Sequence, residues 1–388
     1  MSEQFFQNSD AQNEAEAKAK AEEVQRQQEQ NPFFMDDDEL QKDRYYSMYS
    51  GDDLIYGESI KLEFTLPRLL RSTVGLLVAK GSVGKSMLCL QTMLSSAVGL
   101  DLFGIWTGKS IKDHSGYKNA GWTKADSVEV GMPTDPDDPG NWHLRKLKSA
   151  VLSLEDGHPV VKTRIERMIE DLPDAIKKEA AQNILEIDVS ATGFLACDVQ
   201  GRKLVPSLQF KQAYADLEKF KPDVVYIDTL TLLAGNLDQN SAGEMGQLLA
   251  LLKQMASQLK CSIVLLHHTV KGGSGTGGED ARGSSAIPNN ARWQMNMTTM
   301  TEEEAIKFFE SDDDSTREQL RKKMVRLHNA KMNYGDAIEE TNWLRKEEGG
   351  VIWHCEAEAV DIPDNLDEPA NPVSDSNKQK KKNNKFQK

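Results

Sequence analysis

The sequence lacks any apolar run long enough to span a bilayer. No stretch of the 388 residues approaches the roughly 18 consecutive apolar residues that a membrane helix needs. The first residues, MSEQFFQNSD, also lack the basic stretch followed by an apolar run that is typical of a secretion signal. We therefore expect a cytoplasmic protein without a membrane partner.

Paired cysteines and an excess of positive charge are missing as well. The four cysteines, Cys89, Cys197, Cys261 and Cys355, lie far apart without a CxxC pair, which favours buried free thiols over a metal or disulfide role. The 47 Lys and Arg residues are outnumbered by 61 Asp and Glu residues, so the net charge is -14. This balance argues against a protein that coats nucleic acid with its whole surface. It allows DNA binding in the channel of a ring, where positive charge is needed only beside the phosphates.

Composition divides the chain into three parts. Residues 1–45 are rich in Gln, Glu, Ala and Lys with almost no apolar stripe, which indicates a disordered or solvated helical tail. Residues 46–360 form the predicted domain, in which residues 103–148, rich in Gly, Asp, Pro and Trp, are a surface insertion. Residues 361–388 start acidic and end in KQKKKNNKFQK, which predicts a charged, disordered tail.

Within the central part, short apolar runs alternate with amphipathic segments. This pattern predicts an α/β fold in which helices flank a central, mostly parallel sheet. The predicted strands are 74–79, 149–154, 184–188, 223–228, 261–266, 291–297, 323–330 and 349–354. The predicted helices are 85–98, 158–171, 210–219, 241–259 and 301–310.

The segment LLVAKGSVGKSMLCLQ predicts a phosphate-binding loop between a strand and a helix. Glycines at 81 and 84 let backbone amides approach phosphates, Lys85 would reach the β and γ phosphates, and Ser86 would offer a hydroxyl to Mg²⁺. Ala79 stands where the usual pattern has Gly, which is tolerable if its φ angle stays negative. The pattern therefore predicts a site for ATP, or another NTP, with Mg²⁺. The predicted nucleotide contacts are Gly81, Ser82, Val83, Gly84, Lys85, Ser86 and Met87.

Acidic residues end two of the predicted strands, at the edge where open α/β sheets bind ligands. Asp228 closes the run DVVYID and suits the acid that contacts Mg²⁺ in P-loop enzymes, although a simple turn residue is the alternative. Glu155 follows SAVLSL and is the candidate base that polarises the attacking water. Its neighbour Asp156 better suits the N-cap region of the helix at 158–171.

Two histidines and a Gly-rich segment follow the apolar run CSIVLL. His268 is the candidate sensor of the γ-phosphate, and one of the pair His267 and His268 could instead be a packed histidine. Residues 269–286 are too rich in Gly to hold a fixed shape unaided, which predicts a mobile loop. Lys271 and Arg282 give this loop charge for binding DNA phosphates, and an ordinary surface loop is the alternative.

Taken together, these segments resemble the RepA-type hexameric replicative DNA helicases of plasmids, a RecA-like group of P-loop ATPases also seen in phages. The resemblance implies six subunits around a channel, with ATP bound at each interface. It implies that Arg292 is an arginine finger and that Lys331 also reaches the γ-phosphate. Asn333 stands where DnaB-type ring helicases often have Arg, so the finger role depends on Arg292. The segments that carry the resemblance are LPRLLRSTVGLLVAKGSVGKSML (66–88), LEDGHPVVKTRI (154–165), VVYIDTL (224–230), CSIVLLHHTVKG (261–272), ARGSSAIPNNARWQ (281–294) and AKMNYG (330–335).

The resemblance also implies a replicative helicase that uses ATP to move along single-stranded DNA and unwind forked duplex, 5′ to 3′. The loops at 235–243 and 269–286 are the expected DNA-facing loops, and the two tails are candidate contacts for replication proteins. Two other functions stay open. One is a RecA-like DNA-binding ATPase that acts as a recombination mediator or regulator without unwinding, and the other is a metabolite kinase.

Overall fold

The computed structural model describes residues 18, 47–60, 62–106, 110, 146–194, 196–200, 203–269, 281–309, 313–334 and 343–355. Outside them lie the predicted tails, apart from Lys18, most of the predicted 103–148 insertion, and residues 270–280 of the Gly-rich loop. The chain divides into two compact units, Met1–Lys61 and Leu62–Lys388. The predicted domain boundaries remain predictions.

The described part of the first unit holds one short helix, α3 (Gly51–Tyr56). A capping box begins it, because the Ser50 side chain accepts from the Asp53 amide while the Asp53 carboxylate accepts from the Ser50 amide. None of its residues is buried, and Leu54, Ile55 and Tyr56 are at least 73% exposed.

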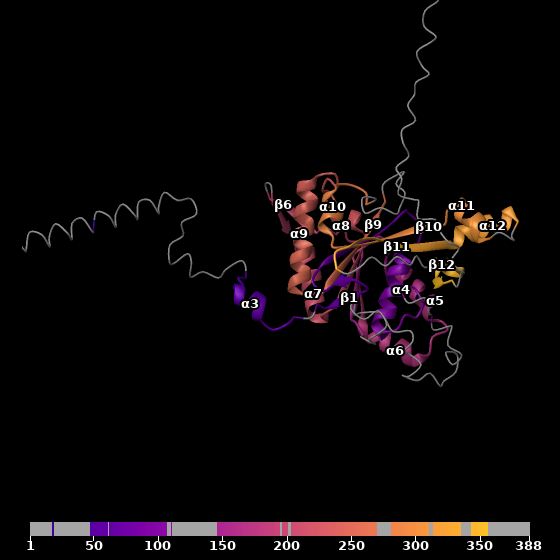
Figure 1. Ribbon diagram of the computed structural model, residues 1–388, viewed down its shortest axis with the longest axis horizontal. Helices are drawn as coiled ribbons and strands as arrows, with labels where there is room; N and C mark the ends of the chain where they lie inside the picture. The colour runs from indigo at the N-terminus through magenta and orange to yellow at the C-terminus, as the bar shows by residue number, and fades with distance from the viewer. Residues whose placement is uncertain are drawn as a thin grey trace, which may run out of the picture. The chain divides into compact units, whose positions relative to one another are not determined.

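A nine-stranded sheet forms the centre of the second unit, in the order β13-β12-β11-β10-β3-β9-β8-β4-β5 (Figure 1). The strands from β10 to β5 in this order run parallel to one another, and β11, β12 and β13 extend the sheet with antiparallel pairs. The predicted α/β class with a mostly parallel central sheet is therefore confirmed. The strands are β3 (Val74–Ala79), β4 (Ser149–Ser153), β5 (Ile184–Asp188), β8 (Val224–Asp228), β9 (Ser262–His268), β10 (Trp293–Thr299), β11 (Met324–Met332), β12 (Trp343–Lys346) and β13 (Ile352–His354).

Helices cover both faces of this sheet because its strands are apolar on both sides. Leu77 of β3 packs in one core cluster with residues of α4, α5 and α6, whereas Leu76 and Val78 pack in a second cluster with residues of α7, α8 and α9. The helices are α4 (Lys85–Val98), α5 (His158–Ile169), α6 (Asp174–Asn183), α7 (Leu208–Phe220), α8 (Leu230–Ala234), α9 (Ala242–Gln258), α10 (Ala286–Asn290), α11 (Glu302–Phe308) and α12 (Asp314–Lys323).

The predicted elements match the structure closely, with differences at their ends. The strand predicted at 349–354 is reduced to Ile352–His354, because Gly349 and Gly350 adopt positive φ angles of 73° and 82° in a short 3-10 turn. The sequence did not predict β12, α3, α6, α8, α10 or α12. It also missed two hairpins, β1 (Phe64–Leu66) with β2 (Leu69–Leu70) and β6 (Cys197–Gln200) with β7 (Lys203–Pro206).

The expected free thiols are present: all four cysteines are free, and Cys89, Cys197 and Cys261 are buried. Among the described residues, no helix has the length and apolar character to cross a membrane.

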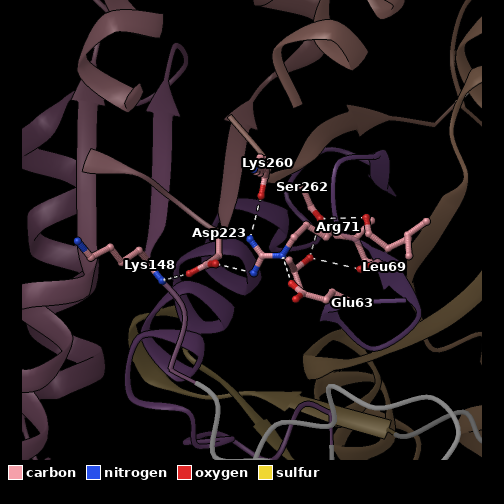
Figure 2. A network of polar contacts seen from close by, with 9 residues as sticks. Glu63, Leu69, Arg71, Lys148, Asp223, Lys260 and Ser262 are labelled. Carbon is pink, nitrogen blue, oxygen red and sulfur yellow. Dashed lines mark hydrogen bonds and ion pairs between the residues drawn. The ribbon is translucent and has the colours of Figure 1, made fainter. Parts of the chain in front are cut away.

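A polar network ties the β1–β2 hairpin to the amino-terminal edge of the sheet (Figure 2). The Arg71 guanidinium donates to Asp223 Oδ1 at 2.6 Å and to the Lys260 carbonyl at 2.8 Å, just before β8 and β9 begin. Glu63 also pairs with Arg71 at 2.8 Å, and Asp223 Oδ2 accepts from the Lys148 amide at 2.9 Å. This network fixes the sheet edge opposite the phosphate-binding loop.

Candidate nucleotide site and basic cluster

The phosphate-binding loop connects the end of β3 to the start of α4, as the sequence predicts. Two loop residues adopt the left-handed conformation, Ser82 with φ 64° and Gly84 with φ 117°. Gly84 is also the N-cap of α4, so the unpaired amides of the first helical turn face the loop. Ala79 is the last residue of β3 and is absent from the described residues with positive φ, which meets the condition set for this substitution.

Lys85 is nearly buried, with 6% of its surface exposed, and its ammonium group lies inside the loop. Its Nζ atom donates to the carbonyls of Ala79 and Lys80, each at 3.3 Å, and lies 3.3 Å from His268 Nδ1. Burial lowers the pKa of Lys85, while the carboxylates of Asp228 and Glu155 act in the opposite direction. The site therefore holds a cation whose present partners are mostly neutral, where phosphate oxygens would bind more strongly.

Asp228 ends β8 beside the loop and is only 7% exposed. Its Oδ1 atom has no hydrogen-bond partner, whereas a hydrogen bond from the Ser86 side chain reaches the carboxylate. Burial is the main cause that raises the pKa of Asp228 to about 6, and Glu155 and Asp156 add to it. In the described part of the chain, no group of three or more His, Cys, Asp or Glu side chains is placed to hold a metal ion. An unpartnered buried carboxylate oxygen and a hydroxyl fit Mg²⁺ that is held jointly with nucleotide phosphates.

Glu155 and Asp156 follow β4 and are attached to the end of β8 through the backbone. The amides of Leu154 and Glu155 both donate to the Asp228 carbonyl, at 2.9 and 3.1 Å. The Glu155 side chain is exposed at this edge, where a nucleophilic water could reach it. Asp156 differs from the prediction: Gly157, not Asp156, is the N-cap of α5, and Asp156 Oδ2 accepts from Arg164 Nη1 at 2.6 Å.

The two histidines at the end of β9 have different environments. His267 is fully buried and its Nε2 atom donates to the Arg282 carbonyl at 2.6 Å, so it is the packed member of the pair. Burial lowers its pKa to about 4. His268 is partly exposed and contacts Lys85, and burial followed by the Lys85 charge lowers its pKa. Of the predicted DNA-binding residues, Arg282 is exposed, and Lys271 lies outside the described residues.

Three cations gather at the opposite edge of the sheet: Arg292, Lys331 and Lys253. Arg292 is exposed and immediately precedes β10, Lys331 lies on β11, and Lys253 lies on α9. Burial lowers the pKa of both lysines, and the charge of Arg292 lowers them further. No acidic side chain in the described ranges forms an ion pair with any of the three. We call these three residues the basic cluster.

The basic cluster and the phosphate-binding loop lie at different ends of parallel strands. Trp293 pairs with Gly75 near the start of β3, and Met297 pairs with Ala79 at its end. The Arg292 amide donates to the Val74 carbonyl at 3.2 Å. Four residue steps along a strand cover roughly 13 Å, so the structure does not bring Arg292 to the loop of its own chain.

Sequence reasoning missed Lys253 and Arg164. Each lies within a helix of mixed polar and apolar residues and belongs to no local motif. Lys253 Nζ donates to Asn290 Oδ1 at 2.9 Å and Lys331 Nζ donates to the Pro288 carbonyl at 2.8 Å, so α10 holds both lysines beside Arg292. Only the packing of α9 and α10 brings Lys253 to this position.

Residues 124–274 match the sequence pattern of a family described as an AAA domain. The match starts beyond the phosphate-binding loop and includes β4, β8 and β9. The fold is that of a RecA-like P-loop ATPase. P-loop ATPases generally bind ATP with Mg²⁺, and the residues around Lys85 and Asp228 fit both.

Two solved structures are similar to this ATPase at low sequence identity. A KaiC-like protein of the hyperthermophilic archaeon Pyrococcus horikoshii is 11% identical, with a TM-score of 0.41 over 77% of this chain and 100% of that chain. The ATPase domain of a second protein is 14% identical, with a TM-score of 0.41 over 74% of this chain and 85% of that chain. Likenesses this distant say nothing about what the chain binds or acts on.

Proposed function

We propose that this chain is the subunit of a homohexameric DNA helicase that uses ATP to translocate on single-stranded DNA and unwind forked duplex 5′ to 3′. The observation that supports it most is the separation of Arg292 from Lys85 by the length of the parallel strands. Each subunit then carries half of an ATP site at each of two edges. A ring of identical subunits joins these halves, because head-to-tail contacts between copies can close into a ring.

One half of the shared site is the phosphate-binding loop. Lys85 leaves the Ala79 and Lys80 carbonyls to bind the β and γ phosphates, and the amides at the start of α4 bind the same oxygens. Mg²⁺ held by Ser86 and Asp228 offsets charge on those oxygens. Glu155 orients the attacking water and accepts its proton.

The other half is the basic cluster of the neighbouring copy. Arg292 and Lys331 stabilise the negative charge that develops on the transferred phosphoryl group, in the manner of an arginine finger. Lys253 adds a third positive charge next to Arg292. A concentration of positive charge without acidic partners is unfavourable for the isolated subunit and becomes favourable when an anionic ligand from the neighbour arrives.

Contacts behind His268 link the nucleotide to the expected DNA-facing loops. The Arg282 amide donates to the His268 carbonyl at 2.9 Å, at the base of the Gly-rich loop. The Ser284 amide donates to the Gln239 carbonyl at 2.8 Å, which joins that base to the loop at 235–243. A change at the γ-phosphate can therefore reach both loops through a few hydrogen bonds, as a motor requires.

The proposal is tested with the full chain on synthetic forks that carry a 5′ or a 3′ single-stranded tail. We expect strand displacement that requires ATP, Mg²⁺ and the 5′ tail, and light scattering should show a hexamer with Mg²⁺ and a non-hydrolysable ATP analogue. DNA-stimulated hydrolysis without displacement of either fork would favour a recombination mediator or regulator. A monomer that transfers phosphate to a small molecule would favour a metabolite kinase.

A further inference from the structure

We propose that Asp156 is a further acidic residue of the nucleotide site, which holds water bound to the metal ion, and that Arg164 is its positioning residue. This inference rests on the proposed binding of ATP with Mg²⁺ at the phosphate-binding loop. It assigns a function to an acid that local sequence rules place in the cap of a helix.

The position of Asp156 is fixed by the backbone beside the metal-binding edge. Ser153 pairs with Asp228 in the sheet, so the side chains of these two residues share one face. The chain then bends around the end of β8, held by two hydrogen bonds to the Asp228 carbonyl. Asp156 is carried next to Asp228, whose pKa its charge helps to raise.

A small cavity joins Asp156 to the metal ligands. Its polar lining consists of Ser86, Ser153, Asp156, Arg164 and Asp228. The volume is about 10 Å³, which is the size of about one water molecule. Asp228 lines this cavity, is 93% buried, and has its Oδ1 atom without a partner. Buried unpartnered oxygens are rare and usually mark a bound water or ion.

Arg164 reaches the cavity because of the spacing of residues on α5. Val161 and Arg164 are three residues apart on the helix, so they lie on the same face, and both line the cavity. The Arg164 Nη1 atom donates to Asp156 Oδ2 at 2.6 Å, and both side chains are about one quarter exposed. This contact uses one carboxylate oxygen of Asp156 and leaves the other for water.

The charges at this edge also explain why an arginine is needed. Glu155, Asp156 and Asp228 bring three acidic groups to one end of β4 and β8. Carboxylates this close repel one another and favour protonation, which would weaken metal binding. Arg164 and Lys85 supply two positive charges on opposite sides of Asp228, so all three acids can stay ionised.

The plainer alternative is an ion pair that only fastens α5 to β4. The two roles differ in their effect on metal affinity, because groups that hold the ligands or waters of a metal typically change its affinity 10- to 100-fold when they are removed, by about that order. A pair that only fastens a helix would lower stability and leave metal affinity unchanged. The affinity for Mn²⁺, which replaces Mg²⁺ and is visible by electron paramagnetic resonance, therefore separates them.

The experiment measures Mn²⁺ binding to the full chain with a non-hydrolysable ATP analogue. We expect Asp156→Asn and Arg164→Gln each to weaken Mn²⁺ binding by about tenfold. Nucleotide binding in EDTA, followed by fluorescence, should stay at the wild-type level. The double variant should be no worse than Asp156→Asn alone, because Arg164 acts through Asp156. Arg164→Lys should recover part of the loss, since it keeps a positive charge near Asp156.

Arg321→Gln is the matched control, because Arg321 pairs with Glu318 at 2.7 Å and its side chain is 26% exposed, as is that of Arg164. It should leave Mn²⁺ affinity unchanged. Wild-type Mn²⁺ affinity in folded Asp156→Asn protein overturns the inference and leaves the ATP site standing. Failure of the wild-type chain to bind Mn²⁺ with the nucleotide overturns the proposed ATP site itself.

Discussion

The ammonium nitrogen of Lys85 lies 3.3 Å from Nδ1 of His268. Because an ammonium group can only donate, His268 accepts through Nδ1 and carries its proton on Nε2. The contact joins the phosphate-binding loop to the end of β9, two segments that are 183 positions apart in the chain. Phosphate oxygens compete for the same ammonium group, so nucleotide binding changes the environment of His268.

His268→Ala should therefore weaken the distinction between ATP and ADP. We expect both nucleotides to bind within about tenfold of wild type, because one hydrogen bond contributes about 1 kcal/mol. The ratio of the two affinities should move towards one, and DNA should no longer stimulate hydrolysis. Fluorescent nucleotide titrations and a hydrolysis assay with and without DNA measure both effects. An unchanged ratio together with full DNA stimulation would contradict the sensor role of His268.

Stability should fall in mild acid because of His267. Its pKa is lowered from 6.5 to about 4 by burial, so between these values the unfolded chain binds a proton that the folded chain does not. The free energy of unfolding then decreases as pH falls, by about 2 kcal/mol between pH 7 and pH 5. His267→Gln keeps a donor for the Arg282 carbonyl and does not titrate. Urea unfolding should show a flatter pH dependence in this variant, and equal slopes would refute the assignment.

Lys253→Met should lower the rate of ATP hydrolysis about tenfold by removing one charge of the basic cluster. Nucleotide binding to the loop of the same chain should not change, because α9 places Lys253 at the other edge of the sheet. Lys219→Met is the control, since that side chain is 78% exposed on α7 and pairs with Asp216. A loss of equal size in both variants would argue against a specific role for Lys253.

Arg71→Met should reduce stability and leave the ATP site intact. Arg71 is 17% exposed and contacts Glu63, Asp223 and the Lys260 carbonyl, so its loss should cost about 1–2 kcal/mol after allowance for solvent screening. Arg345→Met, which removes an exposed pair with Glu347, should cost less than about 0.5 kcal/mol. Denaturant unfolding measures both. Equal costs would show that the network in Figure 2 contributes no more than a surface ion pair.

The sequence predicted the central strands because burial on both faces leaves an uninterrupted apolar run, as in β3, β8 and β9. The β6–β7 hairpin and β12 have four residues per strand and no such run, so no periodicity could reveal them. The phosphate-binding loop and Asp228 were also predictable, because strand, loop and helix are consecutive in the chain.

Asp156 shows where local rules fail. An acid just before a helix suggests a cap, but the first amide of α5, that of His158, donates to Asp188 at the end of β5 instead. Asp156 is thereby free to pair with Arg164. Lys253 likewise acquires its significance from the packing of α9 against α10, which no spacing within either helix could indicate.

A mixture of two inactive variants tests the shared ATP site most directly. Lys85→Ala removes the lysine of the loop, Arg292→Ala removes the arginine of the other edge, and each alone should lose nearly all hydrolysis. In mixed rings at equal amounts, roughly a quarter of the interfaces join an intact loop to an intact Arg292, so activity should return to about that fraction. Hydrolysis that stays at the level of the separate variants, while light scattering and cross-linking show mixed rings, would contradict a site shared between subunits.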